Sequence, residues 1–439
     1  MNGMDGLTAS LGAFIAGLRP SDVPAEARRT VRRGIADCVG VLYAGRDEPV
    51  TGHALAMVTV GASGEAAVLG DRGRAAAPDA AFVNATAAHA LDYDDTGLDG
   101  HPSVVLAPAV LAEAQRLGAT WGEAVAAYVA GYETWAELIF RDADKHHGKG
   151  WHPTAVFGTV ACAAASAHLR RLDPHRAAQA LGIAASMAGG LVANFGSMTK
   201  PLQVGWAARN GLLAAGLAER GVTSSPDALE SPRGFLAALS PAGRVRLDGA
   251  CRAGTPWQIL RQGLNIKRYP VCYALHRAVD AALSLRPRLQ GRLHRIERVT
   301  IAMGRLQAAM LRSSRPVTGL DAKFSAEYAL ACALLNGRLG LAELTDAAVN
   351  APEVQALLRR VQVEPLSTQD AEEPLFSPAD LLRVQLDDGT LLDAEPVHRA
   401  LGHATRPIDD AALKAKFLDC GCTEAVWSAL MCQDEALVA

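Results

Sequence analysis

The chain turns polar at Leu91-Asp92-Tyr93-Asp94-Asp95-Thr96-Gly97-Leu98-Asp99-Gly100-His101-Pro102-Ser103, between two segments that are almost pure Ala, Val and Leu. The segments on either side, Pro78 to His89 and Val104 to Leu117, are both predicted to be apolar helices. We therefore expect the polar run to be a loop or a helix end held between packed helices. An Asp beside a His can form an acid/base pair in which the carboxylate fixes the imidazole tautomer and supports its charged form. The alternative is a surface loop whose Asp and Thr side chains cap helices.

Two further runs place chemically active side chains in small-residue, apolar sequence. The first is Gly150-Trp151-His152-Pro153-Thr154, followed by a predicted helix through Cys162 and Ala167. Because proline suits the first turn of a helix, His152 is expected at a helix start, where free N–H groups and the helix dipole favour anions. The second is Met198-Thr199-Lys200-Pro201-Leu202, where a lone lysine interrupts an Ala- and Gly-rich stretch. Such a lysine either extends into water or binds an anion.

Hydrophobic periodicity predicts a mainly α fold. Residues 7 to about 265 have the pattern of an all-helical domain, and helix returns after Asp409 or Asp410, a predicted N-cap. Between them the pattern is α+β, with a hairpin that turns at Asp387-Asp388-Gly389-Thr390. The predicted elements of this part are the strands Arg295 to Met303, Val361 to Val363 and Leu382 to Leu386 and the helices Leu275 to Leu285 and Phe324 to Leu335. We expect domain boundaries at 1–266, 267–400 and 401–439.

Composition is typical of a soluble metabolic enzyme. The 439 residues are 50% hydrophobic, and the formal net charge of -3 gives no electrostatic case for binding nucleic acid or an anionic membrane. The N-terminus lacks a basic region ahead of its modest apolar run, so a cytoplasmic protein is expected. The eight cysteines have no CxxC pair and no zinc-site spacing, and we expect most of them to be small core residues. Adjacent His146 and His147 lack a third spaced ligand, so no metal site is predicted.

Proton-transfer chemistry is the best interpretation of the polar residues. His101, His152 and Lys200 are candidate proton carriers in the helical half, and Tyr328 is the candidate in the α+β half. Asp92 and Thr96 could orient a histidine or accept a substrate hydroxyl. Removing a proton next to a carboxylate needs cations aimed at that carboxylate, because extra negative charge develops beside it. The candidate cations are Lys200, Lys267, Arg268 and Lys323. No GxGxxG motif, P-loop or GxSxG elbow is present, which disfavours nucleotide cofactors and serine hydrolysis.

Taken together, these runs resemble the MmgE/PrpD family, which includes 2-methylcitrate dehydratase, cis-aconitate decarboxylase and iminodisuccinate epimerase. The likeness covers nearly the whole chain. Besides the three polar runs, it is carried by Ile35-Ala36-Asp37-Cys38-Val39-Gly40, Ala80-Ala81-Phe82-Val83-Asn84-Ala85, Lys267-Arg268-Tyr269-Pro270-Val271-Cys272 with His276, Ala322-Lys323-Phe324-Ser325-Ala326-Glu327-Tyr328 and Lys414-Ala415-Lys416-Phe417. The His-Pro-Thr and Thr-Lys-Pro runs are more similar to the decarboxylase and epimerase branch than to the dehydratase branch.

The resemblance implies a fold, an assembly and a set of site residues. The α+β domain would be an insertion before the C-terminal helices and would cover the active site like a lid. The protein would be a homodimer formed through its helical domain, with no metal or organic cofactor. The implied active-site residues are Asp92, Thr96, His101, His152, Lys200 and Tyr328, joined by His276 from the lid. Two departures from the family pattern bear on the substrate. The chain is one residue shorter between Thr96 and His101, and Gln203 stands where many relatives carry His.

Three functional classes follow from this pattern. We expect an epimerase or isomerase of the iminodisuccinate type, acting next to a carboxylate of a small di- or tricarboxylic acid, because the chain is slightly short for a methylcitrate dehydratase. The first alternative is a lyase, a dehydratase or decarboxylase of a methylcitrate- or cis-aconitate-like acid. The second is a non-catalytic carboxylate-binding protein. His89 and Asn84, on the helix before the polar run, are expected to be core or capping residues.

Overall fold

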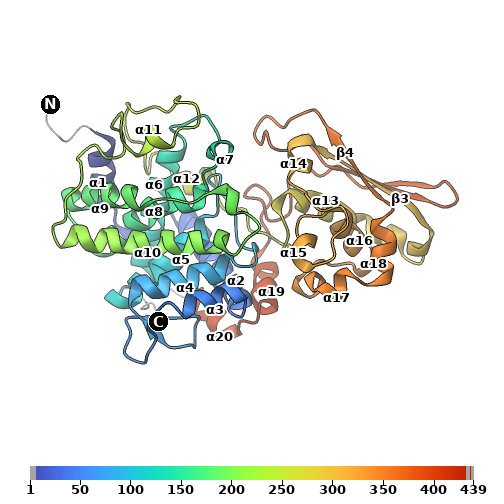
Figure 1. The fold of residues 1–439 in the computed structure, drawn as a ribbon, viewed down its shortest axis with the longest axis horizontal. Helices are drawn as coiled ribbons and strands as arrows, with labels where there is room; N and C mark the ends of the chain where they lie inside the picture. The colour runs from blue at the N-terminus through green and yellow to red at the C-terminus, as the bar shows by residue number, and fades with distance from the viewer. Residues whose placement is uncertain (1–5, 432–435, 437–439) are drawn as a thin grey trace. The chain divides into compact units, whose positions relative to one another are not determined.

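A computed structural model describes residues 6–431 and residue 436 of the protein. These residues form two compact units, one built from the chain up to Ile266 together with the segment from Asp409, and the other from Lys267–Ile408. The first unit is almost entirely helical, and the second combines helices with a small mixed sheet (Figure 1). The predicted fold class, mainly α with an α+β part before the last helices, is confirmed.

Small residues and helix-starting prolines shape the helical unit. Its elements are α1 (Leu7–Gly17), α2 (Ala25–Gly45), α3 (Pro49–Leu55), β1 (Ala66–Ala67), β2 (Arg74–Ala75), α4 (Ala77–His89), α5 (Pro102–Leu117), α6 (Trp121–Ile139), α7 (His146–Lys149), α8 (Pro153–Leu169), α9 (Pro174–Met187), α10 (Thr199–Glu219), α11 (Phe235–Leu239), α12 (Gln258–Arg261), α19 (Asp410–Asp419) and α20 (Glu424–Leu430). Pro102 and Pro153 begin α5 and α8, as expected of a residue that lacks the N–H a first turn cannot use.

Helices α4, α5, α8 and α10 pack against one another at the centre of this unit. Close approach of α10 to α8 depends on Gly211, because a Cβ atom there would lie 2.3 Å from the Cβ of Cys162. The same holds between α10 and α4, where a Cβ on Gly205 would lie 2.6 Å from the main-chain oxygen of Phe82. The predicted close packing through Ala and Gly thus brings the ends of four helices near one another.

The second unit is built around one four-stranded sheet. Its elements are α13 (His276–Leu285), β3 (Ile296–Gly304), α14 (Arg305–Ala309), α15 (Gly319–Ala322), α16 (Ala326–Asn336), α17 (Asp346–Val349), α18 (Pro352–Leu358), β4 (Val361–Leu366), β5 (Leu381–Leu386) and β6 (Leu391–Asp393). The strand order is β4-β3-β5-β6. The predicted hairpin is the antiparallel pair β5 and β6, turning at Gly389, whose φ of 82° favours glycine. The sequence did not predict that β3 and β4 pair in parallel.

Strand β3 supplies part of the sheet's contribution to the unit's core. Val299, Ile301 and Met303 alternate along it and are fully buried, as one face of a strand covered by helices should be. Helix α16 packs on β4 and on α13. Its residues from Ala329 to Leu334 are also fully buried, so the middle of this helix lies inside the core of the second unit.

Two predictions about the whole chain, on membrane-spanning helices and on cysteines, can be compared with the structure of these residues. No helix in the described ranges is both long and apolar enough to cross a membrane. Seven of the eight cysteines lie within the described ranges, none of these seven is in a disulfide, and five of them are buried. The eighth, Cys432, lies outside the described residues.

Candidate active site

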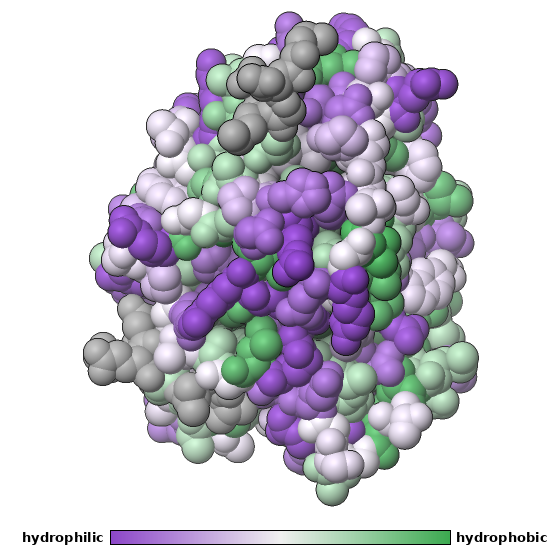
Figure 2. Space-filling view, turned by 90° about the vertical axis from the view of Figure 1, so that its left-hand side faces the viewer, coloured by the Kyte–Doolittle hydropathy of each residue, from purple (hydrophilic) through white to green (hydrophobic). Residues whose placement is uncertain are grey.

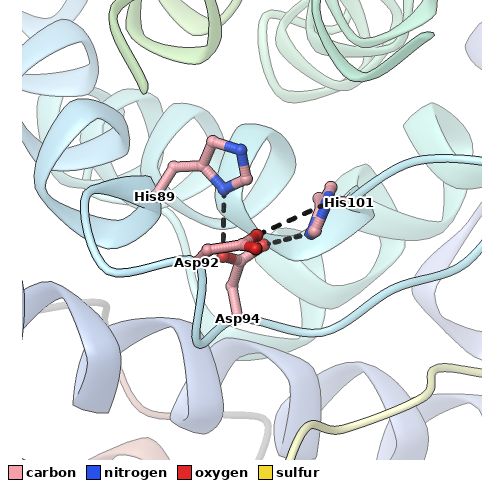
Figure 3. Close-up of side chains that lie close together, drawn as sticks. All are labelled: His89, Asp92, Asp94 and His101. Carbon is pink, nitrogen blue, oxygen red and sulfur yellow. Dashed lines mark hydrogen bonds and ion pairs between the residues drawn. The ribbon is translucent and has the colours of Figure 1, made fainter. Parts of the chain in front are cut away.

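The polar run between α4 and α5 forms a compact cluster of charged and ionisable side chains. His89 is the last residue of α4, Asp92 and Asp94 lie in the loop, and His101 is the N-cap residue of α5. Figure 3 shows the two carboxylates lying between the two imidazoles. One ligand-type atom from each of these four side chains lies within 4.8 Å of the others. The surface-loop alternative is therefore wrong for Asp94, which is fully buried.

Asp94 connects the two histidines. Its Oδ1 lies 2.9 Å from Nδ1 of His89, and its Oδ2 lies 2.6 Å from Nδ1 of His101. Nδ1 of His101 also lies 2.9 Å from the main-chain oxygen of Asp95. Since only acceptors face these two Nδ1 atoms, both must carry a proton, and each ring leaves its Nε2 for other partners.

The electrostatics of this cluster hold Asp94 ionised. Burial alone would raise the pKa of Asp94, but the neighbouring His89 and His101 outweigh it and hold the pKa well below its usual range. Burial lowers the pKa of His89 to about 4, with Lys200 and His101 acting in the same direction against the attraction of Asp94. The buried negative charge thus faces Nδ1 of His101, whose imidazolium form it would stabilise, since His89 stays neutral near pH 7.

Lys200 lies in the first turn of α10 and reaches the same cluster. Its Nζ donates to Oδ1 of Asp92 at 3.0 Å, and Nε2 of His101 lies 3.9 Å from that oxygen. Both Lys200 and Asp92 are only partly exposed, at 15% and 18% of their side chains. Asp92 has a φ of 54°, a left-handed conformation that Asp tolerates better than most residues. The lysine is therefore bound to a carboxylate rather than extended into water.

His152 lies beside these residues at the start of α8. Its ring centroid is 6.1 Å from that of His89 and 4.9 Å from that of Phe195. Nδ1 of His152 is 2.7 Å from Oε1 of Gln203, one turn after Lys200 on α10. Burial, together with the nearby His89 and Lys200, lowers the pKa of His152 to about 2. His152 is therefore a neutral ring next to a cationic group.

Three sets of contacts fix the backbone of the loop that carries the cluster. Thr96 exchanges two main-chain hydrogen bonds with Asn265, at 2.9 and 2.8 Å. The side chain of Asp95 accepts hydrogen bonds from the main-chain N–H and the hydroxyl of Ser103. Burial raises the pKa of Asp95 to about 8, despite those two bonds from Ser103.

The third set comes from α19, near the other end of the chain. Nζ of Lys416 donates to the main-chain oxygen of Tyr93 at 2.8 Å, between the two loop carboxylates Asp92 and Asp94. The same ammonium forms a 2.6 Å ion pair with Asp37 of α2, and both side chains are almost completely buried. Lys416 thus ties the loop to the helical unit.

The cluster has ligand types that metals use, but its geometry is that of a hydrogen-bonded network. Each Nδ1 faces an oxygen at hydrogen-bond distance, and Asp92 already contacts the ammonium of Lys200. A divalent ion bound at these atoms would have to displace both ring protons and the lysine. The donor set therefore fits proton transfer and anion binding better than metal binding.

The other predicted residues belong to the second unit. Lys267 and His276 are almost completely buried, and Lys323 is 8% exposed. His276 lies between two aromatic rings, those of Tyr269 and Tyr273, with centroids 5.2 and 5.1 Å away. The guanidinium of Arg268 lies 5.5 Å from the Tyr269 ring centre.

Tyr328, on α16, is also buried in this unit. Its hydroxyl donates to the main-chain oxygen of Glu343, and burial raises its pKa above the ordinary tyrosine value. The structure thus brings together Asp92, His101, His152 and Lys200. Lys267, Arg268, His276, Lys323 and Tyr328 all lie in the second unit.

Comparison with known families identifies the chain's relatives. The model of the MmgE/PrpD N-terminal domain matches residues 9–248, and that of the MmgE/PrpD C-terminal domain matches residues 269–426. The chain belongs to the MmgE/PrpD family. The first matched region lies within the first compact unit, and the second covers most of the second unit and continues into the C-terminal segment of the first, so the resemblance seen in the sequence motifs is confirmed.

Several MmgE/PrpD proteins of known activity are similar to it over most of their length. Cis-aconitate decarboxylase of Mus musculus is 28% identical over 98% of this chain and 88% of that protein. The Homo sapiens cis-aconitate decarboxylase is 30% identical over 77% of this chain and 71% of its own length. The Aspergillus terreus enzyme of the same name is 27% identical over 91% and 86%.

Sequence reasoning missed two members of the cluster in this MmgE/PrpD protein. His89 was expected to be a core or capping residue; it is buried, but it is bound to Asp94. Asp94 was not distinguished from the other acids of its run. One signal was present in the chain, because His89 ends a predicted helix five residues before Asp94, close enough for a tight loop to bring them together.

Proposed function

We propose that this MmgE/PrpD protein is a cofactor-independent lyase that removes CO2 from a small tricarboxylic acid of the cis-aconitate type. The observation that carries the proposal is the connected cluster of Lys200, Asp92, His101 and Asp94, in a chain whose compared relatives are cis-aconitate decarboxylases. These relatives favour the lyase alternative over the epimerase that the sequence was expected to encode.

The cluster supplies what such a reaction needs. When a carboxylate leaves as CO2, the electron pair of the broken carbon–carbon bond moves into the remaining carbon chain, and one carbon takes up a proton. Lys200 and the protonated form of His101 are the groups able to bind the remaining carboxylates and to supply that proton. Asp94 supports this by stabilising the imidazolium of His101.

Residues of the second unit complete the proposal on the strength of the family resemblance. Lys267, Arg268, His276 and Lys323 are proposed to bind substrate carboxylates, and Tyr328 to assist proton transfer. Their replacement by Met, or of Tyr328 by Phe, is expected to raise KM or lower kcat. Wild-type kinetics in all five variants would restrict the site to the helical unit.

An epimerase is the second candidate, and one observation favours it. The site pairs His101, which faces a carboxylate that would stabilise its imidazolium, with a neutral histidine, His152, and an epimerase needs both an acid and a base at one carbon. A decarboxylase needs only the acid. The two reactions differ in whether CO2 is lost.

Incubation in D2O with a panel of acids tests both candidates. The panel contains cis-aconitate, methylcitrate, tartrate and iminodisuccinate isomers, and products are followed by NMR. Release of CO2 with a new deuterated dicarboxylate from cis-aconitate is expected. Deuterium entering a stereocentre without net product would establish the epimerase instead. Binding without any turnover across the panel would leave a non-catalytic carboxylate-binding protein.

The same assay tests the proposal that no metal or organic cofactor is needed. Turnover is expected to be unchanged in EDTA, because the carboxylates and imidazoles of the cluster already bind one another and Lys200. Activity lost in EDTA and restored by a divalent ion would contradict it.

A further inference from the structure

The hydrogen bond between His152 and Gln203 determines which nitrogen of the His152 ring carries the proton. Nδ1 of His152 lies 2.7 Å from Oε1 of Gln203, and both side chains are almost completely buried. The amide nitrogen of Gln203 donates to the main-chain oxygen of Leu191 at 3.1 Å. Since the NH2 group must face that carbonyl, the amide oxygen must face the imidazole. Nδ1 of His152 is therefore the donor.

The other ring nitrogen then has a lone pair and no partner within the described part of the chain. Nε2 of His152 is buried and forms no hydrogen bond. The titratable groups that face this ring are His89 at the end of α4, His101 before α5 and Lys200 on α10. Burial and the positive charge of Lys200 disfavour a proton on Nε2 of His152, so the ring remains neutral. A buried acceptor nitrogen that has no hydrogen-bond donor can take up a proton, as a general base does.

We propose that Gln203 is a positioning residue that holds His152 as a neutral proton acceptor, while Asp94 makes His101 the cationic member of the pair. The two histidines differ in what faces Nδ1: an amide oxygen for His152 and a carboxylate for His101. This assignment rests on the acid/base function that both candidate reactions share, and it gives each histidine a separate role: the acid alone serves decarboxylation, whereas epimerisation also needs the acceptor.

Two substitutions of Gln203 separate this role from simple packing. Gln203→Met removes the acceptor but keeps the length of the side chain, so the tautomer of His152 is no longer fixed, and kcat/KM is expected to fall at least tenfold. Gln203→Glu keeps an acceptor but adds a negative charge opposite Nδ1, which stabilises the imidazolium. The acidic limb of the kcat/KM profile is then expected to move upward by at least one pH unit.

A matched control distinguishes positioning from the loss of a buried glutamine. Gln179 on α9 is also buried, and its Oε1 accepts hydrogen bonds from Ser224. Gln179→Met is expected to lower the melting temperature without moving the pH profile. A pH profile that is unchanged in Gln203→Glu overturns the proposal.

A second readout does not depend on turnover. In protein labelled with 15N-histidine, the His152 ring, assigned by comparison with His152→Gln, is expected to be protonated only at Nδ1 at neutral pH. It is expected to become a tautomer mixture in Gln203→Met and to take up its second proton at a higher pH than the wild-type ring in Gln203→Glu. A wild-type ring protonated at Nε2, or an unchanged spectrum in Gln203→Met, overturns the role of Gln203 whatever reaction is catalysed. The expected spectra without decarboxylation would instead reject the lyase and leave this role standing.

Discussion

Asp94 is the residue on which the two histidines of the loop depend. It is fully buried and faces Nδ1 of both His89 and His101. A buried carboxylate is stable only when its charge is compensated. Here the two contacts to Nδ1 atoms that compensate it also fix the tautomers of both rings. The same residue thus serves both the fold and the chemistry of the site.

Replacing Asp94 by Asn tests this dual role. Asparagine keeps the shape but cannot stabilise the imidazolium of His101, so kcat/KM is expected to fall at least a hundredfold, or about 3 kcal/mol. Steady-state kinetics on the substrate found in the panel would measure it. Asp79→Asn is the control, because Asp79 is an aspartate of α4 that pairs with the partly exposed Arg209. Equal effects of the two substitutions would contradict the role of Asp94.

Lys200 is expected to act on the transition state rather than on the fold. Its ammonium is bound to Asp92 at 3.0 Å in a partly buried position. Lys200→Met should therefore lower kcat/KM by a hundredfold or more, on the order of 3 kcal/mol, with little change in melting temperature. Lys149→Met, which removes an exposed lysine bound to the main-chain oxygen of Ser240, is the control. A Lys200 variant within threefold of wild type would remove this residue from the site.

Asp95 predicts an unusual dependence of stability on pH. The folded-state pKa of its carboxyl group, about 8, lies above the unfolded value. Its contribution to the free energy of unfolding is therefore complete below pH 4 and is lost as the pH rises to about 8. His89 acts in the opposite direction: its folded-state pKa of about 4 lies below the ordinary 6.5, so stability is lost as the pH falls between these values.

The substitution Asp95→Asn isolates the first effect. Relative to wild type, the variant is expected to gain about 1.4 kcal/mol in unfolding free energy per pH unit between pH 5 and pH 8. Urea unfolding across that range measures the difference. Asp173→Asn, at the exposed N-cap of α9, should give a difference that does not change with pH. A pH-independent difference for Asp95→Asn would show that its carboxyl group is ionised in the fold.

At the scale of elements, helix α19 anchors the loop between α4 and α5. Lys416 binds the main-chain oxygen of Tyr93 and the carboxylate of Asp37, so three segments that are distant in sequence meet at one ammonium group. Burial raises the pKa of Asp37 above its ordinary value, although Lys416 opposes the shift. Removing the lysine alone would leave a buried carboxylate uncompensated, at a cost of about 3 to 5 kcal/mol.

A pair of substitutions separates stability from positioning. Lys416→Met is expected to lower both the melting temperature and kcat/KM. The double substitution Asp37→Asn with Lys416→Met removes the uncompensated charge, so it should recover stability but not kcat/KM, because Tyr93 remains unanchored. Lys414→Met, on the same helix and paired with exposed Glu424, should change neither quantity. Full recovery of kcat/KM in the double variant would show that Lys416 acts through stability alone.

Local sequence signals predicted the elements better than their pairing. Pro102 and Pro153 marked helix starts to within a residue or two, and Gly389 marked the hairpin turn. The parallel pairing of β3 with β4 was missed because it joins segments separated by five helices, and no local pattern encodes it. The same limit applies to the site. His101, His152 and Lys200 were selected by residue type, whereas the central place of Asp94 depends on the folded loop.

At the scale of the whole molecule, the remaining prediction is a homodimer formed through the helical unit. The face in Figure 2 carries hydrophilic residues across its centre and small, separate apolar patches. Helix α10 exposes Trp206, Leu213 and Leu217, by 44%, 37% and 39%. Their spacing places them along one side of the helix, as expected for a surface that packs against a second copy.

Light scattering tests the dimer directly. Wild-type protein at micromolar concentration is expected to have about twice the chain mass of 45.9 kDa, and Trp206→Glu is expected to shift it toward the monomer. Leu391→Glu is the control, because it changes a residue of β6 that is 53% exposed but lies in the second unit. A monomeric wild type would contradict the dimer, and a dimeric Trp206→Glu would place its interface elsewhere.

The position of Lys416 in the chain has a consequence for synthesis. It follows Tyr93 by 323 residues, so a ribosome completes the whole second unit before the anchor of the loop exists. A nascent chain arrested after Ile408 already contains every residue proposed for the chemistry, yet its loop carboxylates lack the contact that holds Tyr93. Activity is therefore expected to appear only when α19 has left the ribosome, well after the last proposed catalytic residue has been translated.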